Sequence, residues 1–307
     1  MTSDARLLPS WRPGATRDAL VAFLDAAESL PPIERVAVFD NDGTLWCERP
    51  TPLQLDFFVD ALVTAAAADP SLRDRPEYAA VLAGDRAAQA SLGLERVALA
   101  LLELFEGLTP AEFDRAARTF MDRARHRTLG MPLRQLVYQP MLELLDELRR
   151  RGFTIFIVSG GGTEFVRAIS NDLYGVPPEA VVGTLIAYEF DRDDRGRPFL
   201  RRASRLGSPA NEGAAKVTHI QSQLGRRPIL AAGNSGGDRE MMEWACAGDG
   251  SSLALLVDHD DAAREFRYAS SAMTFDDREP ILDVADRLGW TVVSMANDWS
   301  QIFPTRG

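Results

Sequence analysis

The stretch VAVFDNDGTL, residues 36–45, places two carboxylates directly after four apolar residues. Val36 to Phe39 has the composition of a strand buried in a protein interior, and Asp40 and Asp42 follow it, one residue apart. Two carboxylates this close resist ionising together unless a cation is present. Asp, Asn and Gly are also common in turns and helix caps. The stretch on its own therefore fits either a turn or a metal-assisted reaction centre.

The composition of the chain is that of a globular protein and limits its partners. With 307 residues, the chain is long enough for one large domain or for a domain with a sizeable insertion. A net charge of −11 argues against non-specific nucleic-acid binding, which needs clustered Lys and Arg, but it permits a phosphate ligand beside a local cation. The two cysteines, Cys47 and Cys246, have no spacing typical of a zinc site or a disulfide framework.

The sequence predicts no association with a membrane. No apolar stretch is long enough to span a bilayer. The opening residues, MTSDARLLPSWRPG, lack the basic start and the apolar core of a secretory signal. We therefore expect a cytoplasmic protein, and no feature of the sequence indicates an oligomeric state.

Short apolar runs recur along the chain and predict a parallel sheet. After Phe39, runs of strand length follow at residues 153–158, 228–232 and 253–257, with helical or loop sequence between them. Such alternation is typical of a parallel sheet that is covered on both faces. A pair of apolar arms around a charged, Gly-containing tip, residues 185–200, predicts a hairpin.

The interval between the first two predicted strands is too long for a simple crossover. A crossover needs about a dozen residues, whereas the chain between Phe39 and Phe153 is long enough for a domain. Most of the interval has helical spacing of its apolar residues and contains no convincing strand. Residues 139–153 have the pattern of an ordinary crossover helix that ends at Gly152. We therefore expect residues 50–137 to form a helical insert.

Polar and glycine-rich motifs follow three of the predicted strands: DNDGT at 40–44, SGGGT at 159–163 and GNSGGD at 233–238. In open parallel sheets, ligands bind outside the carboxyl ends of the strands, so three such motifs at one edge predict a binding site. Glycines before a helix let backbone N–H groups approach an anion. Lys216 lies near the start of another predicted helix, where an anionic partner would explain its charge.

The oxygen-bearing side chains of these motifs predict a site for a hard divalent cation. Asp40, Asp42, Asn234 and Asp238 offer the ligands that Mg²⁺ prefers. In proteins, Mg²⁺ typically combines one or two carboxylates with water and substrate phosphate. The three histidines are scattered along the sequence and indicate no zinc site.

In this order, DNDGT, SGG, Lys216 and GNSGGD match the four motifs of the haloacid dehalogenase-like (HAD) hydrolase superfamily. The segment IVSGGGTEFV is most similar to the phosphoserine phosphatase-like branch. The resemblance implies an α/β fold with a Rossmann-like parallel-sheet core, formed by residues 1–49 and 138–307. It also implies an inserted helical cap of C1 type, formed by residues 50–137.

The resemblance further implies a role for each motif residue. Asp40 would be the nucleophile that forms an aspartyl-phosphate, and Asp42 would protonate the leaving alcohol and then activate water. The residues implied to bind the phosphoryl group are Thr44, Ser159, Gly160 and Lys216. The implied Mg²⁺ ligands are Asp40, the backbone carbonyl of Asp42, and the GNSGGD loop through Asn234 or Asp238.

Two features of these motifs bear on the implied activity. Dehalogenases lack a second acid, because a halide leaving group needs no proton, so Asp42 favours phosphate chemistry. Asn234 stands where the phosphatase motif often has its first aspartate, and it offers a carbonyl oxygen but no charge. The resemblance implies a Mg²⁺-dependent phosphatase that hydrolyses a small phosphomonoester. The alternatives are a catalytically retired regulator that binds phosphate or metal, and a phosphotransferase on the same scaffold.

Glu48 is a candidate specificity residue. It lies close to the position where phosphoserine phosphatases carry a glutamate that reads the substrate amine, although the spacing is one residue shorter and the surrounding LWCERP differs. An amine-bearing phosphoester is therefore one hypothesis for the substrate. Trp46 could pack on a cationic group of such a substrate, or it could be packing at the hinge of the insert.

Overall fold

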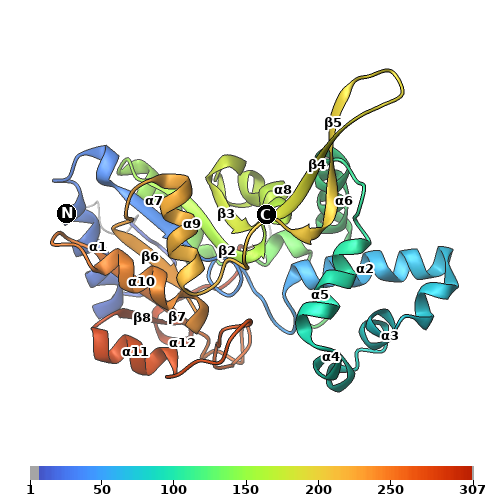
Figure 1. The fold of residues 1–307 in the computed structure, drawn as a ribbon. Helices are drawn as coiled ribbons and strands as arrows, with labels where there is room; N and C mark the ends of the chain where they lie inside the picture. Colours follow the sequence, from blue (N-terminus) through green and yellow to red (C-terminus); the bar gives the residue numbers. More distant parts are fainter. Residues whose placement is uncertain (1–6, 306–307) are drawn as a thin grey trace.

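The computed structural model describes residues 7–305. The first six residues, which begin the segment expected to lack a secretory signal, lie outside the described part. Figure 1 shows a sheet with helices on both faces, a group of helices beside it, and a hairpin that projects from the molecule. Within residues 7–305, no helix has both the length and the apolar character needed to cross a membrane.

Six parallel strands form the main sheet, in the order β3-β2-β1-β6-β7-β8. They are β1 (Val36–Phe39), β2 (Thr154–Gly162), β3 (Val181–Thr184), β6 (Leu230–Gly233), β7 (Leu253–Asp258) and β8 (Thr291–Ser294). The strands expected after Phe39 correspond to β2, β6 and β7, so the predicted parallel sheet is confirmed. The edge strands β3 and β8 were not expected, and each is only 4 residues long.

Alternate side chains of each strand point to opposite faces of the sheet, and different helices cover the two faces. Leu255 and Val257 of β7 belong to one buried cluster, with side chains of α1, α7 and α8, whereas Ala254 and Leu256 belong to another, with side chains of α9, α10 and α11. The core helices are α1 (Ala15–Ala27), α7 (Gln139–Arg150), α8 (Thr163–Tyr174), α9 (Ala214–Leu224), α10 (Arg239–Cys246), α11 (Ile281–Leu288) and α12 (Met295–Asp298), with 3-10 turns η2 (Pro32–Glu34), η5 (Pro178–Ala180) and η6 (Gly236–Asp238). The core is therefore a doubly wound α/β fold, as the sequence predicts.

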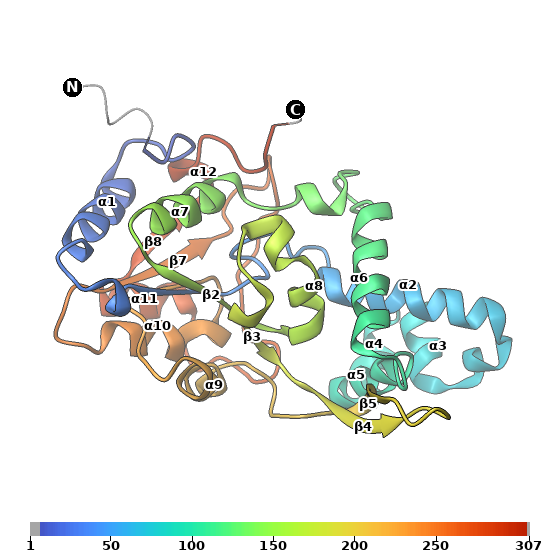
Figure 2. The same cartoon turned by 90° about the horizontal axis from the view of Figure 1, so that it is seen from above.

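The chain between β1 and α7 is helical, as expected. Its helices are α2 (Leu53–Ala68), α3 (Pro76–Leu82), α4 (Arg86–Leu92), α5 (Leu94–Glu103) and α6 (Pro110–Arg123), with 3-10 turns η3 (Pro70–Asp74) and η4 (Leu133–Gln135). They lie to one side of the sheet (Figures 1 and 2). Phe57 of α2 contacts Phe113 and Phe120 of α6 and also Phe165 of α8. An aromatic cluster therefore joins this insert to the core.

The two segments that connect the insert to the core run side by side. The backbone N–H of Cys47 donates to the Leu136 carbonyl at 3.0 Å, and the N–H of Tyr138 donates to the Leu45 carbonyl at 2.9 Å. These hydrogen bonds lie next to the boundaries expected from the sequence. The division into a cap of residues 50–137 and a core stays a prediction.

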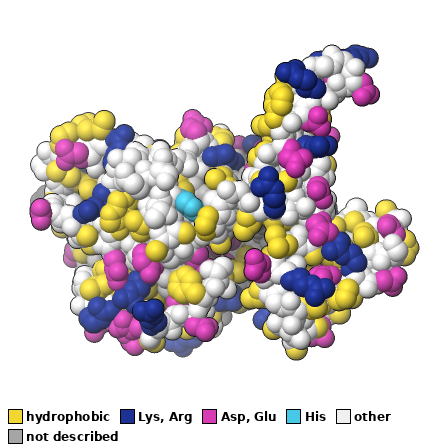
Figure 3. Space-filling model, in the orientation of Figure 1, with side chains coloured by type: hydrophobic (Ala, Val, Ile, Leu, Met, Phe, Trp, Pro, Cys, Tyr) yellow, Lys and Arg dark blue, Asp and Glu magenta, His cyan; other side chains and the backbone are white. Residues whose placement is uncertain are grey.

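The predicted hairpin forms a separate antiparallel sheet of β4 (Ile186–Arg192) and β5 (Pro198–Leu206). Its tip projects into solvent and carries acidic and basic side chains side by side (Figure 3). Its base packs on the insert, because the N–H of Arg202 donates to the Leu108 carbonyl at 2.8 Å and the Arg202 guanidinium lies over the Phe113 ring. The hairpin therefore also joins the insert to the core.

Candidate active site

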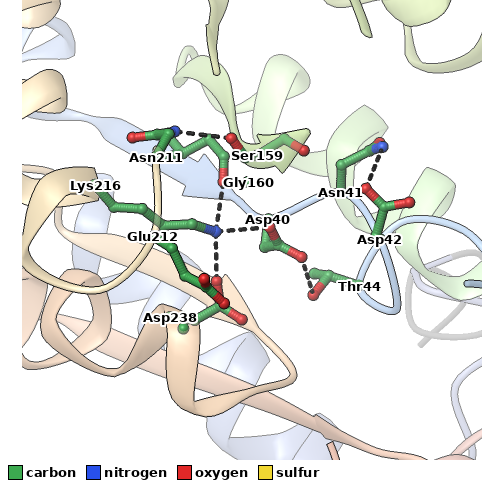
Figure 4. Close-up of polar contacts among 12 residues, drawn as sticks. Asp40, Asn41, Asp42, Thr44, Ser159, Gly160, Asn211, Glu212, Lys216 and Asp238 are labelled. Atoms are coloured by element: carbon green, nitrogen blue, oxygen red, sulfur yellow. Dashed lines mark hydrogen bonds and ion pairs between the residues drawn. The ribbon is translucent and has the colours of Figure 1, made fainter. Parts of the chain in front are cut away.

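The carboxyl ends of β1, β2 and β6 lie together, because these strands are neighbours in the sheet. Asp40 directly follows β1, Ser159 lies near the end of β2, and Asn234 directly follows β6. Figure 4 shows Asp40, Ser159 and Asp238 around the ammonium of Lys216. The structure therefore brings the residues of all four motifs to one edge of the sheet.

Lys216 reaches this edge from the first turn of α9 and is buried, with 2% of its surface exposed. Its Nζ donates to Asp40 Oδ1 at 2.7 Å, to Asp238 Oδ1 at 2.6 Å and to the Val158 carbonyl at 2.8 Å. Burial alone would disfavour the ammonium, but the two carboxylates outweigh burial and raise the pKa of Lys216 above its ordinary value. The side chain is therefore charged and holds two aspartates in place.

The cluster contains more negative than positive charge. Burial raises the pKa of Asp40 well above its ordinary value, repulsion from Asp238 raises it further, and Lys216 offsets these effects only in part. Two carboxylates that share one ammonium leave a net negative charge in a buried place, which is costly unless a further cation balances it.

Asp42 lies beside this cluster and is held by its own loop. Trp46 Nε1 donates to Asp42 Oδ1 at 2.9 Å, and Trp46 is fully buried. Burial raises the pKa of Asp42 to about 6, the hydrogen bond from Trp46 opposes this rise, and the charge of Glu48 adds to it. A carboxyl that titrates near neutral pH can both give and take a proton. In this structure, the hydrogen bond from Trp46 orients the Asp42 side chain within the loop.

We expect Asp42→Asn to stabilise the metal-free protein by about 1–2 kcal/mol at pH 8 and to have little effect near pH 4. The folded pKa of Asp42 is about 6, above the ordinary value of 3.8, so burial favours the protonated carboxyl. The stability that the protonated Asp42 carboxyl contributes to the folded protein is fully present below pH 3.8 and is lost as the pH rises through 6. Urea unfolding in EDTA at several pH values measures the difference between wild type and variant.

The exposed aspartate Asp146 is the control for this measurement, because its carboxylate lies on the surface beside Arg149. Asp146→Asn should show no such pH-dependent gain. A wild type that is more stable than Asp42→Asn at pH 8 would contradict the assigned environment of Asp42.

Thr44 lies beside the Asp40 oxygen that Lys216 does not contact, and it also approaches Asn234. The Thr44 hydroxyl lies 3.4 Å from Asp40 Oδ2 and 3.5 Å from Asn234 Oδ1. One hydroxyl proton therefore serves two acceptor oxygens at long distances. Gly43, with φ 76°, allows the loop to pass this closely, because a Cβ there would lie 2.0 Å from Asn234 Nδ2.

Asp238, the other predicted metal ligand, has both oxygens engaged by protein donors. Its Oδ1 accepts from Lys216, and its Oδ2 accepts from the N–H groups of Asn234 at 3.0 Å and Ser235 at 3.1 Å. Asp238 therefore holds the GNSGGD loop and Lys216 together. Between the two candidates in this loop, Asn234 is the one whose side-chain oxygen approaches the same Thr44 hydroxyl as Asp40 Oδ2.

The SGGG segment presents Ser159 and backbone N–H groups beside the cluster. Ser159 Oγ accepts from the N–H of Gly161 at 3.0 Å, which leaves the hydroxyl proton of Ser159 for another acceptor. The carbonyl of Gly160 accepts from Thr184 Oγ1 at 2.8 Å, so β3 fixes this loop. The N–H of Gly162 donates to Gln54 Oε1 of α2 at 2.7 Å. The insert therefore reaches the glycine-rich loop directly.

Asn211 and Gln54 contact the site although the sequence analysis did not single them out. Asn211 Nδ2 donates to the Ser159 carbonyl at 2.9 Å and to the Val182 carbonyl at 3.1 Å, which ties β2 to β3. Asn211 begins the segment NEGAAK that leads to Lys216, and that position was the one available signal. Gln54 has no local signal, because only the packing of the insert brings it to the loop.

Glu48, the candidate specificity residue, lies on the opposite side of Asn234. Glu48 Oε1 accepts from the Tyr268 hydroxyl at 2.8 Å and from Asn234 Nδ2 at 3.0 Å. Tyr268 comes from the loop after β7, far along the chain from Glu48. The structure therefore connects Glu48 to the GNSGGD loop, a contact that the sequence analysis did not predict.

A profile of the haloacid dehalogenase-like hydrolase family matches residues 37–243, well over half of the chain. The chain belongs to this family. The match begins within β1 and ends within α10, so it contains all four motifs and the insert. The family resemblance that the motifs indicate is confirmed. Among curated protein sequences, no match to the chain is found.

Solved structures with a similar fold have low sequence identity to the chain. A Bordetella pertussis Tohama I protein with unknown function is 17% identical over 85% of this chain and 98% of its own, with a TM-score of 0.52. A phosphoserine phosphohydrolase-like protein from Francisella tularensis is 18% identical over 86% and 95%, with a TM-score of 0.41. A probable phosphoserine phosphatase from Vibrio cholerae is 14% identical over 82% and 64%, with a TM-score of 0.43. The similarity to the Bordetella protein concerns the fold.

Proposed function

We propose that this HAD-family chain is a Mg²⁺-dependent phosphatase that hydrolyses a small phosphomonoester through an aspartyl-phosphate on Asp40. The observation that carries the proposal is the buried cluster of Asp40, Lys216 and Asp238 at the ends of parallel strands. Lys216 donates to one oxygen of Asp40, and the other oxygen has the Thr44 hydroxyl at 3.4 Å. A structural role alone does not account for a buried carboxylate with one oxygen so weakly bonded.

The residues around Asp40 fit a magnesium ion. Asp40 Oδ2 and Asn234 Oδ1 approach the same hydroxyl at 3.4 and 3.5 Å, and the excess negative charge is buried with them. Asp40, the backbone carbonyl of Asp42 and Asn234 would hold the ion, whereas Asp238 is occupied by Lys216 and its own loop. When bound, Mg²⁺ neutralises negative charge on the phosphoryl oxygens and on Asp40.

The chemistry follows from the placement of the side chains. An Asp40 carboxylate oxygen forms a bond to phosphorus while the bond from phosphorus to the substrate alcohol breaks, and protonated Asp42 gives its proton to that alcohol. Asp42 then takes a proton from a water molecule that attacks the phosphoryl group, and the bond between Asp40 and phosphorus breaks to release phosphate. Ser159, the N–H of Gly160 and Lys216 would hold the phosphoryl oxygens, and Thr44 would support the loop.

The position of the insert favours a small substrate. Gln54 of α2 contacts the N–H of Gly162, and Phe57 of the same helix contacts Phe165 just after the glycine-rich loop. A cap in direct contact with the phosphate loop limits the size of the leaving group and excludes water from the first step. The hypothesis of an amine-bearing substrate stays a prediction.

The test is phosphate release by the wild type from a panel of small phosphomonoesters, with Mg²⁺ and with EDTA. We expect turnover of at least one ester that needs Mg²⁺. Folded protein that releases no phosphate across a broad panel would favour the alternative of a phosphate- or metal-binding regulator, for which Asn234 is the motivating residue. Added alcohols separate hydrolysis from transfer, since a phosphotransferase would form new phosphoesters at the expense of free phosphate.

A further inference from the structure

The side chain of Asn234 has two unlike ends, and the structure distinguishes them. Its Nδ2 donates to Glu48 Oε1 at 3.0 Å and lies 3.2 Å from Ser270 Oγ, while its Oδ1 faces the Thr44 hydroxyl. An aspartate at this position would present an oxygen in either orientation, whereas an amide presents an oxygen in one orientation and two N–H donors in the other. Asn234 can therefore be a cation ligand only if its amide is held with the oxygen, not the nitrogen, toward the cation.

Most neighbours of the amide accept either orientation. The hydroxyls of Thr44 and Ser270 can donate or accept, so neither selects an orientation. His259 Nε2 lies 2.8 Å from the Gly43 carbonyl, which only accepts, so its proton is given to that carbonyl, and His259, 3.5 Å from Asn234 Nδ2, does not hold the amide. Glu48 differs from them, because an ionised carboxylate only accepts. If the amide turned over, its oxygen would face the carboxylate oxygen of Glu48.

Glu48 is itself fixed by a second contact. The Tyr268 hydroxyl donates to Glu48 Oε1 at 2.8 Å, and burial together with the charge of Glu48 raises the pKa of Tyr268, so the phenol keeps its proton. Tyr268 stacks on His259 with ring centroids 4.2 Å apart. The Arg49 guanidinium lies 4.1 Å from the centre of the Tyr268 ring. The residue that donates to Glu48 is therefore itself held by its own ring contacts.

From these contacts we infer that Glu48 is a positioning residue that orients the Asn234 amide, so that oxygen rather than nitrogen faces the Thr44 hydroxyl, which Asp40 also approaches, and the cation. The inference rests on the proposed function only in placing a divalent cation beside Asp40. It assigns Glu48 a role at the metal site, in place of the earlier hypothesis that Glu48 binds an amine of the substrate. The chain thus has a neutral ligand, Asn234, that is held by the carboxylate of Glu48, at a position where other members of the family often have an aspartate.

The test is a double-mutant cycle with Mg²⁺ affinity as its readout, measured by isothermal titration calorimetry without substrate. Glu48→Ala is made in the wild type and in Asn234→Asp. In the wild type we expect the affinity for Mg²⁺ to fall about 10-fold or more, the usual cost of losing a group that orients a metal ligand. In Asn234→Asp we expect no loss, because a carboxylate has two like ends and needs no orientation.

Three variants make the result specific. Glu48→Gln keeps an acceptor oxygen for Asn234, so we expect it to retain more affinity than Glu48→Ala. Should Glu48→Ala fail to fold, Glu48→Lys takes its place in the cycle. Asp146→Ala removes a surface charge far from these contacts and should leave the affinity unchanged. Glu48→Lys places a donor opposite Asn234 Nδ2 and should lower the affinity at least as far as Glu48→Ala.

The other outcomes overturn the inference. Equal losses for Glu48→Ala in both backgrounds, matched by Glu48→Gln, would show that only the charge of Glu48 matters. Unchanged Mg²⁺ affinity with selective loss of turnover on amine-bearing esters would assign Glu48 to the substrate. A wild type that binds no Mg²⁺ would overturn the proposed function as well, whereas Mg²⁺ binding with no difference between backgrounds would overturn this inference alone.

Discussion

Asp40→Asn is expected to lower phosphomonoester turnover by about 10⁴-fold or more, the scale seen when a covalent nucleophile is removed. The neutral amide has no carboxylate oxygen to form the bond to phosphorus. Its size and shape are those of aspartate, and its oxygen can still accept from Lys216, which donates to Asp40 at 2.7 Å in the wild type. Phosphate release at saturating Mg²⁺, on protein shown to be folded by circular dichroism, measures the loss.

The exposed Asp146, treated in the same way, is the control for this variant. Asp146→Asn removes the same charge from a surface position beside Arg149 and should leave turnover unchanged. A folded Asp40→Asn protein that turns over the best substrate within about 10-fold of the wild type would exclude Asp40 as the nucleophile.

Lys216→Met is expected to destabilise the protein by about 3–5 kcal/mol and to abolish turnover, because it leaves two carboxylates buried without their cation. Lys216 contacts Asp40 Oδ1 and Asp238 Oδ1 at 2.7 and 2.6 Å, and it is 2% exposed, so water does not replace it. Methionine keeps much of the side-chain volume, which limits the effect of a cavity. Urea unfolding in EDTA gives the difference in the free energy of unfolding.

A second substitution separates charge from packing in this prediction. Lys216→Met combined with Asp238→Asn removes one of the two uncompensated carboxylates, so it should recover part of the lost stability but none of the turnover. If Lys216→Met were as stable as the wild type, Asp40 and Asp238 would not share a buried ammonium, and the account of the site would be wrong.

The core strands could be predicted because each is a compact apolar run with a polar or glycine-rich motif directly behind it. VAVF before DNDGT is buried at all four positions, so residues on both faces of the sheet are apolar. In FTIFIV before SGGGT, Thr154 is exposed and Phe156 is half-buried, and the other residues are buried. The two edge strands have weaker signals. β3 contains Gly183 and β8 ends in Ser294, and each strand has a neighbour on one side only.

The insert could be recognised from chain length, because the interval between β1 and β2 exceeds what a crossover requires. Its contact with the hairpin could not be predicted in the same way. Arg202 of β5 packs on Phe113 of α6 although 89 positions separate them, and no local pattern encodes such a contact. The arrangement depends on how the two units meet in space.

The motif residues of the site follow from sequence, since they stand directly at strand ends or at a helix start. Their partners do not. Trp46 lies four positions after Asp42 within one loop and offered two readings, neither of which was the hydrogen bond to Asp42. Asn211, Gln54 and Tyr268 are ordinary polar or aromatic residues whose roles depend on tertiary contacts with the loops they hold.

The proposed reaction passes through a covalent phosphoryl group on Asp40, and trapping that intermediate tests the proposal most directly. Wild-type protein is mixed with its best phosphomonoester and Mg²⁺, quenched in acid within one turnover and digested for mass spectrometry. We expect the peptide that contains Asp40 to carry a phosphoryl group that hydroxylamine removes, and the same peptide of Asp40→Asn to carry none. A phosphoryl group on another residue, or none during confirmed turnover, would contradict the mechanism.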